Sequence, residues 1–191
     1  MKKRQKQKKI ILSRGFSLVE LLVTISILTV VSGVVLFNHA RFNNNVLIEN
    51  LSYEISLTIR QAQFFGWQVK EAGGGFGEGY GAHFDSNSDE FLIFADTYPA
   101  APNQIYDAGY DEIVDRFRMT NNNEINELCF ESTCDASTLD ISFIRPNPNA
   151  FIRENGGGID RETAEIRVIS PKGLVKKIMV NKVGQIAVQE I

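Results

Sequence analysis

The run FSLVELLVTISILTVVSGVVLF, residues 16–37, decides the fold, because Glu20 is its only formal charge. At about 1.5 Å per residue, a helix of this length spans a hydrocarbon layer about 30 Å thick, so the run predicts a transmembrane helix. A cleavable secretory signal is one alternative, but its apolar region is shorter and ends in a small-x-small cleavage pattern that does not follow here. A buried helix of a soluble core is the other alternative, and the absence of polar alternation and the basic flank argue against it.

Charge is distributed unevenly along the chain. Residues 1–15 hold seven Lys and Arg and no acid, whereas the whole chain of 191 residues has 20 Lys and Arg against 23 Asp and Glu. The remainder therefore carries 13 bases and 23 acids, a net charge of −10. Basic residues before an apolar span stay on the cytoplasmic side. The pattern predicts a single-pass protein of the cytoplasmic membrane, with its N-terminus in the cytoplasm and its C-terminal body outside it.

Glu20 requires an explanation, because a carboxylate inside a membrane helix costs about 2.5 kcal/mol or more unless it is paired or faces water. Gly15 and Phe16 precede it by five and four residues. If the chain were cut between them, a new α-amino group would appear near Glu20. That amine and the carboxylate could neutralise each other between neighbouring subunits.

The segment GFSLVELLVTISIL, residues 15–28, resembles the type IV prepilin family, whose members share a basic leader, a Gly, a Phe and a Glu as fifth residue of the mature chain. The resemblance implies that residues 1–15 are a leader removed after Gly15 by a prepilin peptidase, that Phe16 is N-methylated, and that Glu20 guides assembly. It further implies membrane lipid, other pilin or pseudopilin subunits and an inner-membrane assembly platform as partners, and a final place in a pilus or pseudopilus.

The chain beyond the apolar run divides into a helical and a β-rich part. Residues 38–72 are predicted to continue the helix as an amphipathic segment, and residues 73–191 to form a globular head that a glycine-rich linker over 73–81 introduces. The expected fold class is α+β, with one long N-terminal helix packed on a small antiparallel sheet. The helical stripe is expected at Leu47, Leu51, Ile55, Ile59, Ala62, Gly66 and Val69, and strands at 80–84, 90–96, 113–119, 124–130, 139–145, 164–170, 175–180 and 185–188.

The C-terminal third is expected to be a meander. Residues 170–173 and 181–184 have turn sequences between its strands. The loop within 94–117 and the ending over 178–188 are similar to those of H-type minor pseudopilins of type II secretion.

The same loop suggests calcium, the one cofactor considered, because hard cations prefer several carboxylate oxygens. The candidate ligands are Asp107, Asp111 and Asp115, although their spacing is not that of an EF-hand and such turns are usually just solvated.

Cys129 and Cys134 enclose four residues in a body expected to be exported, where a disulfide is favoured. Free thiols are the alternative, and zinc is disfavoured because two Cys supply only half of its ligands. His83 is interpreted as a strand residue rather than a metal ligand. No motif for nucleophilic or metal-dependent hydrolysis occurs, so the chain is not expected to be an enzyme.

Three functions remain. The first is a structural subunit, a minor pilin or pseudopilin of a type IV pilus or type II secretion pseudopilus. The second is a minor pilin that binds DNA for uptake, for which the four lysines Lys172, Lys176, Lys177 and Lys182 argue and the charge of −10 argues against. The third, a membrane-anchored surface protein that acts alone, leaves the pattern of Gly15, Phe16 and Glu20 unexplained.

Overall fold

A computed structural model describes residues 15–68, 71–72, 75–76, 79–97, 102–131, 133–157 and 160–190, with only the backbone over 37–44 and 71–76. The chain forms two compact units, Met1–Phe42 and Asn43–Ile191, and each is described by itself. Residues 1–14 of the expected leader, and Val69 of the expected stripe, lie outside the described residues.

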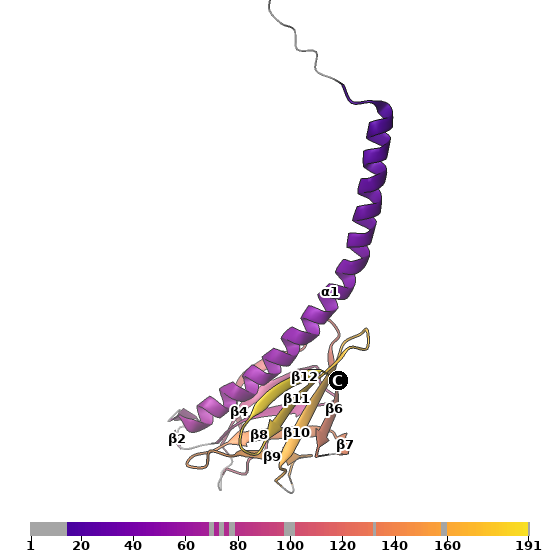
Figure 1. The fold of residues 1–191 in the computed structure, drawn as a ribbon. Helices are drawn as coiled ribbons and strands as arrows, with labels where there is room; N and C mark the ends of the chain where they lie inside the picture. Colours follow the sequence, from indigo (N-terminus) through magenta and orange to yellow (C-terminus); the bar gives the residue numbers. More distant parts are fainter. Residues whose placement is uncertain are drawn as a thin grey trace, which may run out of the picture. The chain divides into compact units, whose positions relative to one another are not determined.

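The first unit contains the apolar half of helix α1, which runs over Leu18–Trp67 (Figure 1). Its window Leu18–Leu36 has 19 residues, a mean hydropathy of 2.4 and no buried side chain. The hydroxyls of Thr24, Ser26 and Thr29 each donate to a carbonyl one turn earlier, at 2.7–2.9 Å. These polar groups are satisfied within the helix, as an apolar environment requires.

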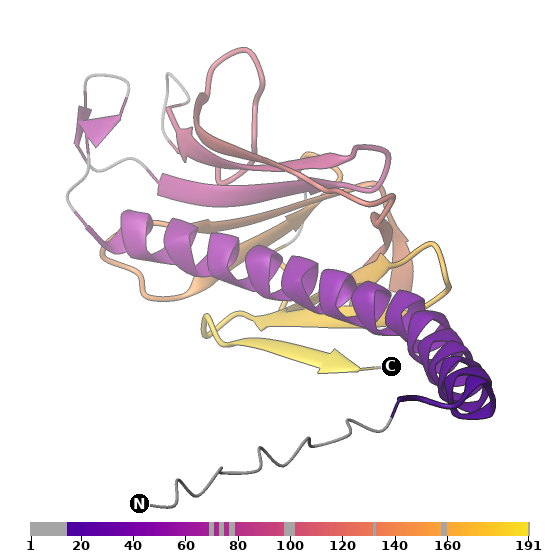
Figure 2. The same ribbon diagram turned by 90° about the horizontal axis from the view of Figure 1, so that it is seen from above.

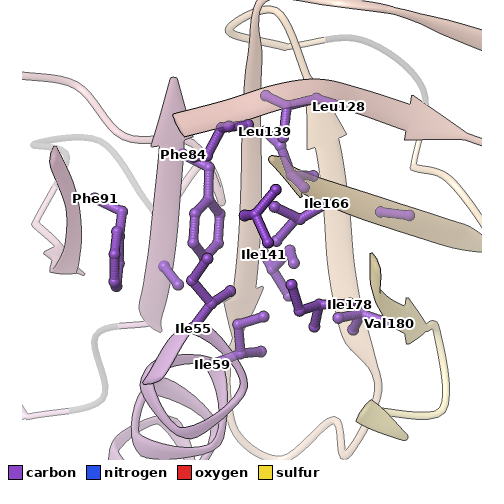
Figure 3. Packing of buried hydrophobic residues seen from close by; sticks show 14 of the residues in the cluster. Ile55, Ile59, Phe84, Phe91, Leu128, Leu139, Ile141, Ile166, Ile178 and Val180 are labelled. Atoms are coloured by element: carbon purple, nitrogen blue, oxygen red, sulfur yellow. The ribbon is translucent and has the colours of Figure 1, made fainter. Parts of the chain in front are cut away.

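The second unit begins with the amphipathic half of α1. Ile48, Leu51, Ile55 and Ile59 are buried, and Figure 3 shows Ile55 and Ile59 pointing from the helix into the core. Leu47, the first residue of the expected stripe, is only half-buried, and the fully buried face begins at Ile48 instead.

A polar residue explains the difference. Ser52 is fully buried in the middle of this face, and its hydroxyl donates to the Ile48 carbonyl at 2.7 Å. Because the buried face of α1 includes this polar residue, the positions of the apolar residues alone predict the centre of that face slightly incorrectly.

The strands form two five-stranded antiparallel sheets rather than one small sheet. The first sheet has the order β5-β4-β3-β8-β9 and consists of β3 (Gly79–Asp85), β4 (Glu90–Asp96), β5 (Glu112–Arg118), β8 (Thr138–Phe143) and β9 (Ala150–Glu154). The second has the order β12-β11-β10-β6-β7 and consists of β6 (Glu124–Phe130), β7 (Thr133–Ala136), β10 (Thr163–Ile169), β11 (Val175–Asn181) and β12 (Ile186–Glu190). The α+β fold class is confirmed.

The glycine-rich stretch is not a plain linker. Strands β1 (Glu71–Ala72) and β2 (Gly75–Phe76) pair with each other, and β3 begins at Gly79. Gly81 lies within β3, at a position that has no room for a side chain. A Cβ added there would come 2.5 Å from the ring of Phe94. Close packing explains this glycine, whereas a sequence reading associates glycine with turns.

One hydrophobic core lies between the two sheets and the helix. It combines Phe84 and Ile141 of the first sheet with Ile166 and Ile178 of the second (Figure 3). Figure 2 shows the helix lying between β12 and the first sheet. The side chains of Arg60 and Gln63 donate to the carbonyls of Ile186 and Gly184, both at 3.3 Å, and so fix the helix against the β12 side.

The closing strands form the expected meander. The amide of Gly173 donates to the Ser170 carbonyl at 2.9 Å, and that of Gly184 to the Asn181 carbonyl at 2.8 Å. Both glycines have a positive φ, 78° and 83°, which residues with a side chain rarely adopt. The two predicted turns are therefore confirmed.

Candidate functional site

The start of α1 is capped by its own sequence. The Ser17 hydroxyl accepts a hydrogen bond from the Glu20 amide at 3.3 Å, and the Ser17 carbonyl accepts one from the Leu21 amide at 3.1 Å. Ser17 is thus the N-cap, and a Glu three residues later has the spacing of a capping box. The apolar run and the charges alone do not indicate this cap; the sequence signal that identifies Ser17 is the Ser-x-x-Glu pattern directly before an apolar run.

The Glu20 carboxylate is exposed in the first turn, where a negative charge suits the helix dipole. It makes no ion pair or side-chain hydrogen bond with any other residue that the structure describes. Phe16, just before the helix, is 71% exposed. Both side chains are therefore accessible to another molecule.

Gly15 lies in open surroundings. A Cβ added there meets no described atom within 4 Å. The fold of this region therefore does not need glycine, and any requirement for it must come from a molecule that binds the chain. This separates Gly15 from Gly81, which the packing of the head does require.

A second apolar surface lies on the outward face of α1 within the head. We call it the outer seam: Val46, Tyr53, Leu57, Phe64 and Trp67, which are between 37% and 62% exposed. Together with Asn50 and Arg60 these residues recur at alternating steps of three and four, the spacing at which one helix packs on another. A groove beside the seam is lined by Phe117 of β5 together with Asn50, Tyr53, Glu54, Leu57, Thr58 and Gln61.

The acidic loop uses its carboxylates to hold its own backbone. One oxygen of Asp111 accepts the Thr97 amide at 2.9 Å and the other accepts the Asp107 amide at 2.7 Å. The Asp107 carboxylate accepts the side-chain amide of Asn103 at 2.6 Å. Burial raises the pKa of Asp111, while the two amide hydrogen bonds oppose that rise.

The expected calcium triad is not assembled. Asp115 lies exposed on β5 and accepts the amide of its neighbour Arg116 at 2.9 Å. Among the described residues, Asp107, Asp111 and Asp115 do not form a group of ligand atoms within 4.8 Å of one another. The equal spacing in sequence failed as a guide because Asp115 belongs to a strand and the other two to a loop. Calcium binding itself stays a prediction.

Cys129 and Cys134 are joined by a disulfide bond, which connects β6 to β7. Glu127 lies close to both sulfurs, but its carboxylate accepts a hydrogen bond from Arg167 at 2.7 Å. Bonded sulfurs are not thiolates and cannot serve as metal ligands. This group is therefore structural, and it links two strands at the edge of the second sheet.

His83 lies on β3, and its Nδ1 is 2.7 Å from Oδ1 of Asp140, its cross-strand neighbour on β8. The Asp140 side chain is 1% exposed, and the Tyr106 ring lies 4.8 Å from that of His83. Burial raises the pKa of Asp140; His83 and the Tyr106 amide lower it in part, and the nearby Asp107 charge adds to the rise. The pair anchors the acidic loop to the first sheet.

Replacing Asp140 with asparagine is expected to change how stability depends on pH. The raised pKa means that the folded chain holds its proton more tightly than the unfolded chain, so ionisation of Asp140 lowers the stability of the wild type. Near pH 4 the two chains should differ least, and the variant should gain stability relative to the wild type as the pH rises towards about 7. Urea unfolding of both chains measures this difference, and a pH-independent difference would contradict the expectation.

The four lysines considered for DNA do not form an open basic patch. Lys176 pairs with Glu190, Lys177 lies 3.8 Å from Glu165, and Lys182 lies 3.2 Å from Asp160. Lys176 and Lys177 are also adjacent in β11, so they point to opposite faces. The carboxylates beside these three lysines compete with phosphate for them.

The comparison with known families matches residues 12–36 to a prokaryotic N-terminal methylation motif. No curated protein and no solved structure matches the chain. The matched segment contains Gly15, Phe16, Ser17 and Glu20 and ends where the apolar window of α1 ends. This motif supports a pilin-like subunit with a membrane-anchoring helix, implies a peptidase and other pilins as partners, and is typical of structural rather than enzymatic proteins.

Proposed function

We propose that this chain is a minor pilin or pseudopilin, a structural subunit of a type IV pilus or a type II secretion pseudopilus. The prepilin peptidase cleaves it after Gly15, the new terminus at Phe16 is methylated, and the apolar half of α1 brings the subunit into the filament. The observation that carries the proposal is the arrangement at residues 15–20: an accessible glycine, an exposed Phe16 and a Glu20 with no side-chain partner among the described residues, at the start of a capped apolar helix.

The apolar half of α1 is suited both to a lipid bilayer and to packing against other helices in a filament. No side chain of its window Leu18–Leu36 is buried, so lipid or other helices must cover it. About 19 residues of helix match the thickness of a bilayer core, and the same residues can pack against neighbouring helices after the subunit leaves the membrane. An inner-membrane assembly platform would carry out that transfer.

The outer seam supports assembly through the head as well. Its apolar residues lie opposite the buried stripe and face solvent, although burying them would be favourable. The spacing of Val46, Tyr53, Leu57 and Phe64 along α1 fits a helix from a neighbouring subunit. DNA uptake has less support, because three of the four lysines already lie beside carboxylates.

Mass spectrometry of the wild-type chain, purified from membranes of cells that contain a prepilin peptidase, tests the proposal. The expected product begins at Phe16 and carries one methyl group on its α-amine. The same chain from cells without the peptidase should keep residues 1–15. A chain that retains its leader in both strains would overturn the proposal.

A further inference from the structure

A shallow depression lies at the end of α1, on the head. It is lined by Trp67 of the helix and by four consecutive residues after β8: Arg145, Pro146, Asn147 and Pro148. Trp67 is 46% exposed, and the two prolines are exposed beside it. We call this surface the Trp67 shelf. It offers an aromatic face and a guanidinium within one hollow.

The side-chain donors of the shelf have no partner among the residues that the structure describes. Arg145 is half-buried, yet it makes no ion pair or hydrogen bond with any residue among the described ones, whereas Arg116, Arg118, Arg161 and Arg167 all pair with carboxylates. The side-chain oxygen Oδ1 of Asn147 accepts a hydrogen bond from the Asn149 backbone amide at 3.0 Å. Its NH₂ group, like the Trp67 indole N–H, has no partner within the described ranges.

We propose that the Trp67 shelf binds a saccharide that carries a carboxylate, such as a uronic acid within an oligosaccharide. A pyranose ring has a face of C–H groups that can lie on the indole, which combines an apolar body with a polar tip. The guanidinium of Arg145 binds a carboxylate through two parallel hydrogen bonds. The Asn147 NH₂ group can donate to a ring hydroxyl.

The charge of the shelf selects this ligand class. Arg145 has no partner among the described residues, and on a body with a net charge of −10 it is a local site for one anionic group, because charges are screened beyond about 10 Å at moderate salt. A neutral sugar leaves the guanidinium unpaired, and a densely charged anionic polymer meets repulsion from the net negative charge of the body. One carboxylate on an otherwise neutral saccharide fits both conditions.

The chain contains its own probe for the test. Trp67 is its single tryptophan, so intrinsic fluorescence reports directly on the shelf. The full chain, in detergent micelles, would be titrated with a xylo-oligosaccharide that bears one glucuronic acid and, in parallel, with neutral xylotetraose. Saturable quenching or a blue shift is expected with the acidic sugar, at an affinity at least about tenfold tighter than that for the neutral one.

Arg145→Gln should weaken binding of the acidic sugar by at least about tenfold and abolish the preference over the neutral sugar. Arg118→Gln is the matched control: it removes an exposed arginine from β5, at the opposite end of the first sheet, and should leave binding unchanged. Calorimetry on Trp67→Ala, which lacks the fluorophore, should detect no binding.

The proposal would be overturned if both sugars bound with equal affinity, if the two arginine substitutions had equal effects, or if no saturable signal appeared. It would also be overturned if the shelf bound a proline-rich peptide and neither sugar. The inference rests on the proposed function only for placing the head outside the cytoplasm. Binding is measured in vitro and processing in membranes, so failure of one is distinguishable from failure of the other.

Discussion

Replacing Gly15 with leucine is expected to leave nearly all of the chain unprocessed, with its leader attached and Phe16 unmethylated. An added Cβ at this position meets no described atom within 4 Å, so the fold does not oppose the larger residue. Any loss must therefore arise in the peptidase, whose site has to accept the residue before the cut. The intact mass of the membrane-purified variant measures the outcome directly.

Gly33→Ala provides the matched control for this experiment. Gly33 lies in α1, which begins three residues after Gly15, and its added Cβ also meets no described atom within 4 Å. This variant should be processed like the wild type. A normal mature mass for Gly15→Leu would show that cleavage after residue 15 does not require glycine, and it would contradict the prediction.

Replacing Glu20 with alanine is expected to allow insertion and cleavage but to lower assembly into filaments by about tenfold or more. In the proposed filament, an ionised Glu20 would pair with the methylated α-amine of Phe16 of a neighbouring subunit in an apolar interior, and removing one partner would leave the other charge uncompensated. A tenfold loss corresponds to only about 1.4 kcal/mol, a modest value for such a pair. The measurement is the fraction of mature chain recovered in sheared or sedimented filaments.

Two further variants separate this charge from the helix cap. Glu20→Gln keeps the shape of the side chain but removes its charge, and it should assemble as poorly as Glu20→Ala. Ser17→Ala removes the cap, worth about 1 kcal/mol, but keeps the charge, and it should assemble far better. If Glu20→Gln assembled normally while Ser17→Ala did not, Glu20 would contribute to assembly by capping the helix rather than by pairing with a neighbouring amine.

The sequence predicts an element correctly where one strong physical signal determines its structure. The apolar run predicts the first half of α1, because few other structures accommodate so many consecutive apolar residues. Strands β4 and β6 have the predicted bounds, 90–96 and 124–130, because each combines β-branched or aromatic residues with clear turn signals on both sides. The turns at Gly173 and Gly184 follow from conformations that only glycine adopts easily.

The remainder depends on contacts that a linear pattern does not contain. Strand β7 consists of TCDA, three of whose four residues are exposed, and it exists through pairing with β6 and the disulfide. The pairing of His83 with Asp140 joins residues 57 positions apart and depends on the register of β3 and β8. The Trp67 shelf likewise forms only when the end of the helix meets the loop after β8.

The order of strands in the two sheets has a consequence for when the head can fold. The chain builds β3, β4 and β5 of the first sheet, crosses to β6 and β7 of the second, returns for β8 and β9, and crosses again for β10 to β12. Neither sheet is complete until late in the chain, and Ile55 and Ile59 of the helix share their core with Ile178 and Val180. Contacts so distant in sequence make folding slow. With the proposed topology, in which the N-terminus stays in the cytoplasm and the head crosses the membrane beginning next to the apolar run, Ile55 and Ile59 would stay uncovered until nearly the whole head has been translocated.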